Sequence, residues 1–398
     1  MNPAGDTWTE FVTSGSSPSM RKENSGAART PERVAPEFFQ FRAAPSPWIL
    51  QERVAPEFFQ FRAAPHPGSS RSGWHRNSSS SPLEHASAGI AGTPGTVGVM
   101  PTEPVLRPFG SVLVAMVTPF TASGDLDSEA AASIAVQLVD DGCDGLVVSG
   151  TTGESPTTSD AEKDALLRSV LEAVGDRATV IAGAGTNDTA HSIELARQAA
   201  KAGVHGLLAV SPYYNKPPQE GVIAHFRAIA DATDLPVMLY DIPSRSSIPI
   251  ATETQVRLAE HPRIVAVKDA KGDLYAGSWV LARTDLAYYS GSDELNLAWL
   301  AHGGAGVVSV VGHVAARQYR QMVTAVDACD LPAARRVNDQ LLPAVRGIMT
   351  RTQGAIMAKA ALELTGRTAG RAVRLPLVAA TDEQVATLRD DLGEAQLL

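Results

Sequence analysis

Cysteine is scarce in this sequence of 398 residues, which contains only Cys143 and Cys329. The two are far apart and form no Cys-x-x-Cys pair, so the sequence supports neither a disulfide framework nor a thiolate zinc site, and it favours a reducing compartment. No two histidines have the His-x-x-x-His spacing of a metal-binding helix. We therefore expect a protein without a metal ion or other cofactor.

The sequence also lacks a surplus of positive charge and any long hydrophobic run. It has 34 Lys and Arg residues against 43 Asp and Glu, a formal net charge of −9, whereas nucleic-acid-binding proteins usually carry a basic excess. No apolar run approaches the roughly 18–20 residues of a membrane-spanning helix. We expect a cytoplasmic protein that binds neither nucleic acid nor membrane.

Hydrophobic periodicity is missing from residues 1–109. Residues 1–110 contain 14 of the 26 prolines, a composition that cannot bury enough apolar surface to offset chain entropy. We predict a disordered Pro/Ser/Gly-rich extension over residues 1–109. It contains a 14-residue tandem repeat, ERVAPEFFQFRAAP, at Glu32–Pro45 and Glu52–Pro65. The repeat is a pair of partner-binding motifs, a duplication without function, or the result of a translation start placed too early.

From Gly110 onward, short apolar runs alternate with segments of helical periodicity. The runs recur about every 25 residues, the length of one βα unit, and are continuous, as in strands that helices cover. They are Val112–Val117, Gly145–Val148, Thr179–Ala182, Gly206–Val210, Pro236–Tyr240, Ile264–Val267, Ala287–Tyr289 and Gly306–Val310. These units predict an α/β fold, a (β/α)8 TIM barrel over residues 110–325, with an open doubly wound sheet as the alternative.

Residues 326–398 have helical periodicity only and are predicted to form a C-terminal helical appendage. The helices expected near and after the last apolar run are Ala315–Ala328, Pro332–Met349, Ala355–Leu364 and Asp382–Leu392. Between the predicted strands, the helix candidates include Ser128–Leu138, Asp160–Val174, Ala190–Ala202 and Glu220–Ala230.

Lys268 is the most informative polar residue, because it directly follows the predicted strand Ile264–Val267. In a barrel, the C-terminal ends of the strands and the loops after them form the active site. A lysine at the mouth of an apolar barrel is partly desolvated, which lowers its pKa and frees the amine to attack a ketone and form an imine. The alternative is a lysine whose ammonium group reaches the solvent.

Hydroxyl groups at other strand ends could serve such an imine. Tyr240 ends the neighbouring predicted strand, and Thr152 and Tyr214 follow two others. A phenol with an unperturbed pKa of about 10 needs hydrogen-bonded partners to relay protons near neutral pH. The three residues together predict a proton relay, whereas core packing is the alternative for either ring taken alone.

Two further features could bind carboxylates. The turn Gly150-Thr151-Thr152-Gly153 presents backbone N–H groups just before a predicted helix. Arg245 follows Pro243 at the mouth of the predicted barrel, and its planar guanidinium group suits bidentate binding of a second carboxylate. The alternatives are an ordinary connecting loop and a surface ion pair.

Together these motifs resemble the 4-hydroxy-tetrahydrodipicolinate synthase (dihydrodipicolinate synthase) family, in the pyruvate-dependent class I aldolase superfamily. The resemblance covers the chain from about Gly110 to the C-terminus, in order and in spacing. The segments that carry it are GTTGE at Gly150–Glu154, SPYYNKP at Ser211–Pro217, YDIPSR at Tyr240–Arg245, VKDA at Val267–Ala270 and SGSDE at Ser290–Glu294.

The resemblance implies a Schiff-base lyase of lysine and diaminopimelate biosynthesis. Such an enzyme condenses pyruvate with L-aspartate-4-semialdehyde to 4-hydroxy-tetrahydrodipicolinate and uses no cofactor. Lys268 is then the residue that forms the Schiff base with pyruvate. Tyr240, Thr152 and Tyr214 are implied to form the proton relay, with Tyr214 contributed across a dimer interface.

The resemblance also implies the substrate-binding residues and the assembly. Thr151 and Thr152 help to hold the pyruvate carboxylate, and Arg245 binds the carboxylate of the semialdehyde. Gly291 and Val308 match positions that line the pyruvate site. The usual assembly is a homotetramer built as a dimer of dimers.

In lysine-inhibited members of this family, a regulatory site lies at the tight dimer interface. The residues here that match it are Ser155, Asn187 and Tyr213. Asp160, Lys163 and His191 occupy positions that carry histidines and a glutamate in those members. A positive charge at Lys163 and the missing carboxylate at His191 disfavour a cationic ligand, so we expect lysine to inhibit weakly or not at all.

Two alternative functions stay open. The first is a related pyruvate-dependent aldolase for a sialic or 2-keto-3-deoxy sugar acid, although Arg245 and the YYN motif around Tyr214 favour the semialdehyde. The second is a non-catalytic scaffold that binds a partner through the N-terminal repeats. Asp241 stands where many members of the family have asparagine, and we expect little effect of this on the core chemistry.

Overall fold

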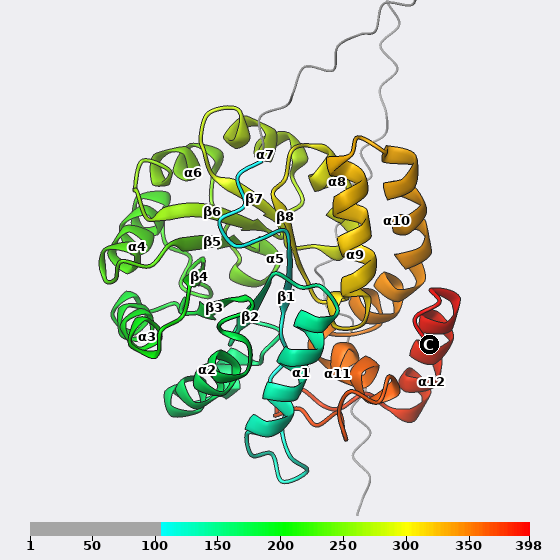
Figure 1. The fold of residues 1–398 in the computed structure, drawn as a ribbon. Helices are drawn as coiled ribbons and strands as arrows, with labels where there is room; N and C mark the ends of the chain where they lie inside the picture. Colours follow the sequence, from blue (N-terminus) through cyan, green and yellow to red (C-terminus); the bar gives the residue numbers. More distant parts are fainter. Residues whose placement is uncertain (1–104) are drawn as a thin grey trace, which may run out of the picture. The chain divides into compact units, whose positions relative to one another are not determined.

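The structure is a computed structural model that describes residues 105–398. The tandem repeat and residues 1–104 of the predicted extension lie outside the described residues. Within residues 105–398, eight parallel strands follow one another around a closed barrel (Figure 1). The strands are β1 (Val112–Ala115), β2 (Gly145–Val148), β3 (Thr179–Gly183), β4 (Gly206–Val210), β5 (Val237–Asp241), β6 (Ile264–Asp269), β7 (Ala287–Ser290) and β8 (Gly306–Ser309). The predicted (β/α)8 barrel is confirmed, and the alternative of an open sheet is wrong, because β8 pairs with β1.

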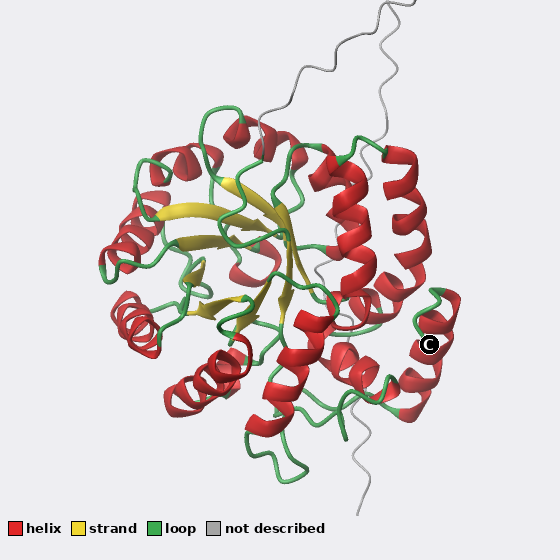
Figure 2. Ribbon diagram, viewed as in Figure 1, coloured by secondary structure: helices red, strands yellow, loops and turns green. Residues whose placement is uncertain are grey.

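Helices surround the barrel and cover the outer face of its strands (Figure 2). They are α1 (Ser128–Asp140), α2 (Asp160–Val174), α3 (Thr189–Ala202), α4 (Gln219–Asp231), α6 (Thr252–Leu258), α7 (Leu274–Leu281), α8 (Asn296–Ala301) and α9 (Gly312–Asp327). The short helix α5 (Pro243–Ser246) lies instead at the centre of the ring of strands in the view of Figure 1. Capping side chains fix several of their first turns. Asp127 caps α1, and Ser159 forms a capping box with Glu162 at the start of α2.

Alternation along the strands divides the apolar core into an outer and an inner part. In β5, Val237 and Leu239 pack outward against the helices, whereas Met238 and Tyr240 lie in the cluster inside the barrel. The inner cluster also contains Leu113, Ala115, Val147, Ile181, Leu208, Ala266, Tyr289 and Val308. Because side chains alternate in a strand, Lys268, two residues after Ala266, also points inward.

Arg107 and Phe109 precede the predicted start of the barrel at Gly110, but the structure packs both against it. Phe109 is 1% exposed, and its backbone N–H donates to the hydroxyl of Tyr289. The guanidinium group of Arg107 donates two hydrogen bonds to Asp327 at the end of α9. The packed part of the chain therefore begins before Gly110.

The C-terminal region continues with α10 (Leu331–Val345), a π-helical turn (Arg346–Thr350), α11 (Gly354–Leu364) and α12 (Asp382–Glu394). The predicted single helix Pro332–Met349 is therefore divided at Val345. Pro343 lies inside α10 and has no N–H to donate to the helix, and the π-helical turn begins three residues later. No helix in residues 105–398 is long and apolar enough to cross a membrane.

Candidate active site

Lys268 lies inside strand β6, which extends to Asp269, and not after the strand as predicted. In the register of the sheet it is opposite Tyr240 on β5 and Tyr289 on β7. Its side chain is buried, and Nζ lies 4.4 Å from the centroid of the Tyr240 ring. The strand thus holds an amine inside the barrel next to a phenol.

Burial lowers the pKa of Lys268 to about 8, because desolvation disfavours the ammonium form. The carboxylate of Asp293 opposes this shift, and the positive charge of Arg245 adds to it. About a tenth of such an amine is uncharged at pH 7, and this fraction can attack a carbonyl carbon.

Gly291, just after β7, leaves the space that the Lys268 side chain occupies. A Cβ at this position would lie 2.9 Å from Cγ and 3.0 Å from Cε of Lys268, closer than side-chain atoms normally approach. The N–H of Gly291 donates to the carbonyl of Asp269 over 2.7 Å and fixes this close approach. A glycine is therefore required here for a steric reason.

A cavity of about 380 Å³ contains Lys268 and most of the other predicted site residues. Those that line it are Lys268, Tyr240, Thr151, Thr152, Arg245 and Gly291. Val308 is fully buried in the inner apolar cluster and does not line the cavity. The closed barrel has brought together residues that are as much as 140 positions apart in the sequence.

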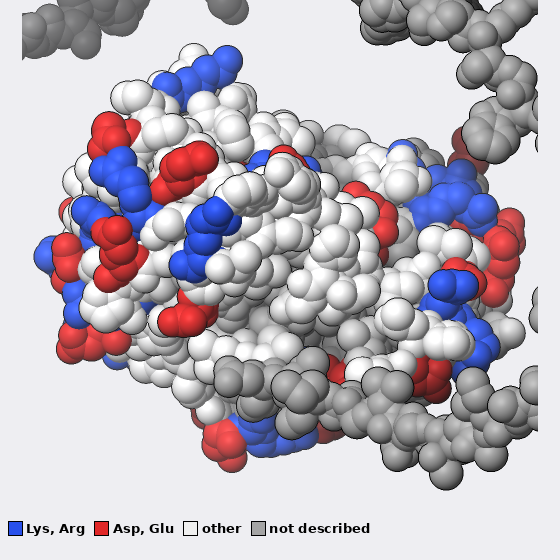
Figure 3. Space-filling model, turned by 90° about the horizontal axis from the view of Figure 1, so that it is seen from above, with Lys and Arg blue, Asp and Glu red and all other residues white. Residues whose placement is uncertain are grey.

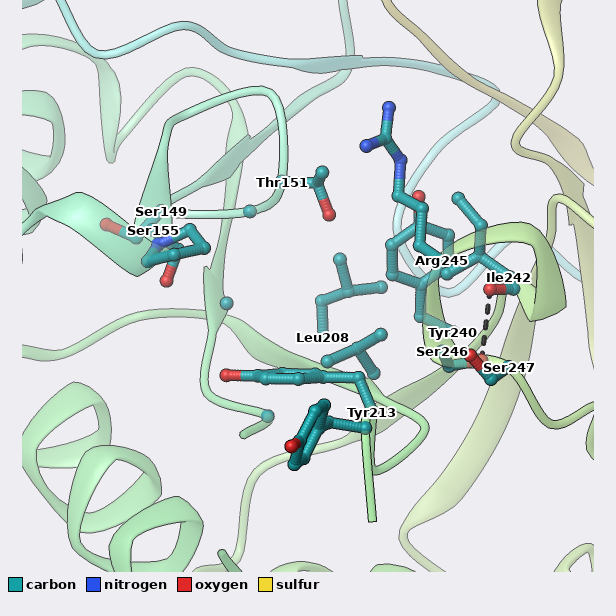
Figure 4. Close-up of a pocket in the computed structure, with 16 residues that line it drawn as sticks. Ser149, Thr151, Ser155, Leu208, Tyr213, Tyr240, Ile242, Arg245, Ser246 and Ser247 are labelled. Atoms are coloured by element: carbon teal, nitrogen blue, oxygen red, sulfur yellow. Dashed lines mark hydrogen bonds between the residues drawn. The ribbon is translucent and has the colours of Figure 1, made fainter. Parts of the chain in front are cut away.

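Tyr214 lines a second, neighbouring cavity of about 360 Å³. The two cavities share Thr151, Tyr240, Ile242 and Arg245. Figure 4 shows Thr151 between Ser155 on one side and Tyr240 and Arg245 on the other. Tyr214 has a positive φ of 72° and a side chain that is 87% exposed. Within one chain it is therefore next to the Lys268 cavity and not part of its lining.

Tyr240 and Thr151 both line the two cavities. Burial raises the pKa of Tyr240 to about 12, while the positive charge of Arg245 and a hydrogen bond with the Thr151 side chain act in the opposite direction. The phenol therefore keeps its proton at neutral pH. The sequence analysis predicts Thr152 in the relay and Thr151 only at the pyruvate carboxylate; the structure places both threonines in the lining of the Lys268 cavity with Tyr240, and Thr151 also in that of the second cavity.

Asp293 is a charged group near Lys268 to which the sequence analysis gave no role. It lies in the SGSDE segment and is 4% exposed. Its carboxylate accepts hydrogen bonds from the N–H groups of Val310 and Val311, over 2.8 and 3.1 Å, and from the hydroxyl of Ser309. The motif marked the position, but only the fold shows that its charge acts on the pKa of Lys268.

Lys271 also lines the Lys268 cavity, as do four residues of the C-terminal region, Met349, Gln353, Gly354 and Ala355. The sequence analysis gave none of them a place in the site. Lys271 Nζ lies 3.2 Å from the carboxylate of Asp241, which is fully buried. Met349, from the π-helical turn, and Gln353 reach the same cavity. No local sequence signal connects the last two to Lys268, which lies more than 80 residues earlier. Among residues 105–398, no three His, Cys, Asp or Glu side chains are placed to hold a metal ion.

Comparison with known proteins gives consistent results. Residues 108–395 match the model of the Dihydrodipicolinate synthetase family. The chain is 69% identical to the 4-hydroxy-tetrahydrodipicolinate synthase of Kineococcus radiotolerans over 292 residues, and these residues cover 73% of this chain and 95% of that protein. It is 61% identical to 4-hydroxy-tetrahydrodipicolinate synthase 2 of Streptomyces coelicolor over 293 residues, and these residues cover 74% of this chain and 97% of the relative.

Solved structures agree with these relatives. The crystal structure of DHDPS from Cyanidioschyzon merolae with lysine bound has a TM-score of 0.71 at 43% identity, and the match covers 74% of this chain and all of that one. The chloride-inhibited dihydrodipicolinate synthase from Acinetobacter baumannii, complexed with pyruvate, has a TM-score of 0.70 at 33% identity, over 73% of this chain and 100% of the other. From its sequence and its barrel alike, the chain belongs to the dihydrodipicolinate synthetase family.

Proposed function

We propose that this chain condenses pyruvate with L-aspartate-4-semialdehyde to 4-hydroxy-tetrahydrodipicolinate through a Schiff base on Lys268. The observation that carries the proposal is the buried amine of Lys268, with its pKa lowered to about 8, beside the Tyr240 phenol. The names of the relatives that are 61–69% identical support the choice of reaction. The product belongs to the diaminopimelate branch of lysine biosynthesis.

The reaction begins when Nζ of uncharged Lys268 attacks the keto carbon of pyruvate. The carbinolamine oxygen takes up a proton and leaves as water, which gives the imine. Loss of a proton from the methyl carbon gives an enamine, whose carbon attacks the aldehyde carbon of the semialdehyde. The amino group of the second substrate then attacks the imine carbon, closes the ring and releases the lysine.

We assign the proton transfers to Tyr240, Thr151 and Tyr214. Tyr240 is neutral and adjoins the amine, and Thr151 lines both cavities together with it. Tyr214 lines the second cavity, next to that of Lys268. Thr152 is kept as a ligand of the pyruvate carboxylate, together with Thr151.

Arg245 is proposed to bind the carboxylate of the semialdehyde. It lines the Lys268 cavity, and the short helix α5 that carries it follows directly after β5. A guanidinium group presents two parallel N–H donors to a carboxylate. The same charge lowers the pKa of Lys268, so Arg245 serves both substrates. Gly291 gives the lysine room, and Val308 belongs to the apolar interior beside it.

We propose a cytoplasmic homotetramer, built as a dimer of dimers, in which Tyr214 completes the site of a neighbouring subunit. Its 87% exposure in the single chain supports this role. Tyr275 and Trp279 on α7 are 74% and 41% exposed, and a view from above Figure 1 shows a broad area without charged side chains (Figure 3). Sedimentation of the purified protein measures the assembly directly.

Borohydride reduction in the presence of pyruvate tests the chemistry. We expect a covalent adduct on Lys268 in the wild type and none in Lys268→Arg, with turnover reduced by at least about 1,000-fold. Lys216→Gln, at an exposed lysine outside the Lys268 cavity, serves as the control and should be labelled like the wild type. Labelling elsewhere, or turnover only with a sugar-derived aldehyde, would overturn the proposed reaction.

A further inference from the structure

Glu154 ends the GTTGE segment, yet its side chain does not line either cavity. It is 3% exposed and has a positive φ of 55°, a conformation that non-glycine residues adopt only where the surroundings hold them. Its N–H donates to the carbonyl of Thr151 over 3.1 Å, and the N–H of Ser155 donates to Gly150. Glu154 therefore closes the turn that presents Thr151 and Thr152 to the site.

Both carboxylate oxygens of Glu154 are bound by the C-terminal region. Oε1 lies 2.5 Å from Nζ of Lys359, and Oε2 accepts the backbone N–H of Arg374 over 2.9 Å. Lys359 is itself 3% exposed and donates a second hydrogen bond, of 2.7 Å, to the carbonyl of Ala372. A buried charge needs its partner, since removal of one member leaves the other unpaired in a medium of low polarity.

Phe120 and the Arg374 side chain surround this ion pair. Nζ of Lys359 and Cζ of Arg374 each lie 4.2 Å from the centroid of the Phe120 ring. The guanidinium group of Arg374 donates to the carbonyls of Gly124 and Thr157, each over 2.9 Å. The segment after α11 thus binds the loops that follow both β1 and β2.

Helix α11 connects the ion pair to the Lys268 cavity. Gln353, Gly354 and Ala355, at its beginning, line that cavity. Lys359 lies further along the same helix and reaches Glu154. Helix α11 therefore contributes to the wall of the cavity with its first residues and binds Glu154 of the turn with Lys359.

We propose that Glu154 and Lys359 are positioning residues, whose buried ion pair fixes the turn Gly150–Gly153 so that Thr151 and Thr152 meet pyruvate. The C-terminal region then takes part in substrate binding, beyond packing against the barrel. This inference rests on the proposed function, because it assigns the purpose of the turn to pyruvate.

The test compares Glu154→Gln and Lys359→Met with Glu363→Gln. Glu363 is on the same helix and pairs with Arg371, so its variant removes a carboxylate from α11 while the Glu154–Lys359 pair stays whole, and it is the matched control. We expect each test variant to raise the KM for pyruvate about 10- to 100-fold, since small displacements of a binding group have effects of this size. The KM for the semialdehyde should change far less, and the control should keep the KM for pyruvate of the wild type.

The double variant E154Q/K359M measures how strongly Glu154 and Lys359 depend on each other in their effect on the KM for pyruvate. If the pair acts as a unit, the double variant has a KM for pyruvate similar to that of the worse single variant, not the product of the two effects. An unchanged KM for pyruvate in both single variants, or the same rise in Glu363→Gln, would refute the positioning role. Should the single variants fail to fold, Phe120→Leu loosens Lys359 without removing a charge, and an unchanged KM in that variant refutes the role as well.

Trapping by borohydride separates this inference from the proposed function. A wild type that forms no adduct with pyruvate contradicts the proposed function, whatever the variants do. A wild type that forms the adduct, with variants whose adduct formation has the same dependence on pyruvate concentration, contradicts only the role of Glu154 and Lys359.

Discussion

Tyr240 and Lys268 are paired across strands β5 and β6, with the lysine Nζ 4.4 Å from the centre of the phenol ring. Burial acts on both groups in the direction of the neutral form. It raises the pKa of Tyr240 to about 12 and lowers that of Lys268 to about 8. Near neutral pH the phenol can therefore give a proton while a fraction of the amine is free to attack. Imine formation needs this combination of a free amine and a neutral acid.

Replacing Arg245 with glutamine should shift the pH dependence of imine formation to higher pH. The charge of Arg245 lowers the pKa of Lys268, so its removal raises that pKa above about 8. Adduct formation with pyruvate alone should rise with pH to a plateau in both proteins, with less adduct at pH 7 in Arg245→Gln. Rates of borohydride trapping across the pH range measure this. A pH profile identical to that of the wild type would show that the charge of Arg245 does not act on the pKa of the amine. Arg283→Gln, just after α7 and outside the lining of the Lys268 cavity, is the control for the loss of one positive charge.

Thr151→Val and Thr152→Val should have different kinetic effects. Thr151 lines both cavities with Tyr240 and is assigned to the proton relay, so its loss should lower kcat by roughly 100-fold, in the range of a lost proton-transfer group. Thr152 is buried and lines only the Lys268 cavity, so its loss should act mainly on the KM for pyruvate. Steady-state measurements of kcat and of the KM for pyruvate in both variants test this. A lower kcat in Thr152→Val and a higher KM in Thr151→Val would show that Thr152, not Thr151, belongs to the proton relay.

Asp269→Asn should stabilise the protein at alkaline pH. Burial raises the pKa of Asp269 to about 6, and the negative charge of the nearby Asp241 adds to this rise. The hydrogen bond from the Gly272 N–H acts in the opposite direction. The folded state holds this proton more tightly than the unfolded chain, whose aspartate pKa is about 4. The free energy of unfolding therefore falls as pH rises from about 4 through 6, by about 2–3 kcal/mol.

Thermal unfolding between pH 4 and 8 measures that effect. Asparagine keeps the oxygen that accepts the Gly272 N–H and removes the ionisation, so the variant should have the higher Tm at pH 8 and lose its advantage near pH 4. Asp234→Asn, at a fully exposed side chain, should follow the wild type. A Tm difference that does not depend on pH would mean that Asp269 ionises as freely as in the unfolded chain.

L-Lysine should inhibit this enzyme weakly or not at all. Lys163 is buried, its Nζ donates to the carbonyl of Thr158, and the carboxylate of Asp160 lies 3.7 Å from it. The other oxygen of Asp160 lies 2.9 Å from Nε2 of His191. The carboxylate that could receive a cationic ligand thus already has two basic partners, and Lys163 would repel the ligand. Initial rates at millimolar L-lysine measure this, and strong inhibition would contradict it; the variant Lys163→His with His191→Glu should gain sensitivity.

The strands of the barrel can be predicted from the sequence more completely than the environment of the site residues. The apolar run predicts a strand at Ile264–Val267 and excludes Lys268 and Asp269 from it, because polar residues end such a run. In the structure the strand continues, since Lys268 is buried inside the barrel and Asp269 on the outer side of the same strand. The burial that lowers the pKa of the amine comes from the closed barrel and has no local signal.

The eight βα units, the lysine at the sixth strand and the family can be predicted from the sequence, because strand and helix periodicity and short motifs are properties of neighbouring residues. Three relationships come from the folded barrel alone: Thr151 and Tyr240 line the same cavity, Asp293 acts on the pKa of Lys268, and Glu154 pairs with Lys359, 205 residues later. Such pairings depend on how the barrel closes and where α11 packs. A periodic pattern records which residues are buried, not which distant side chains they meet.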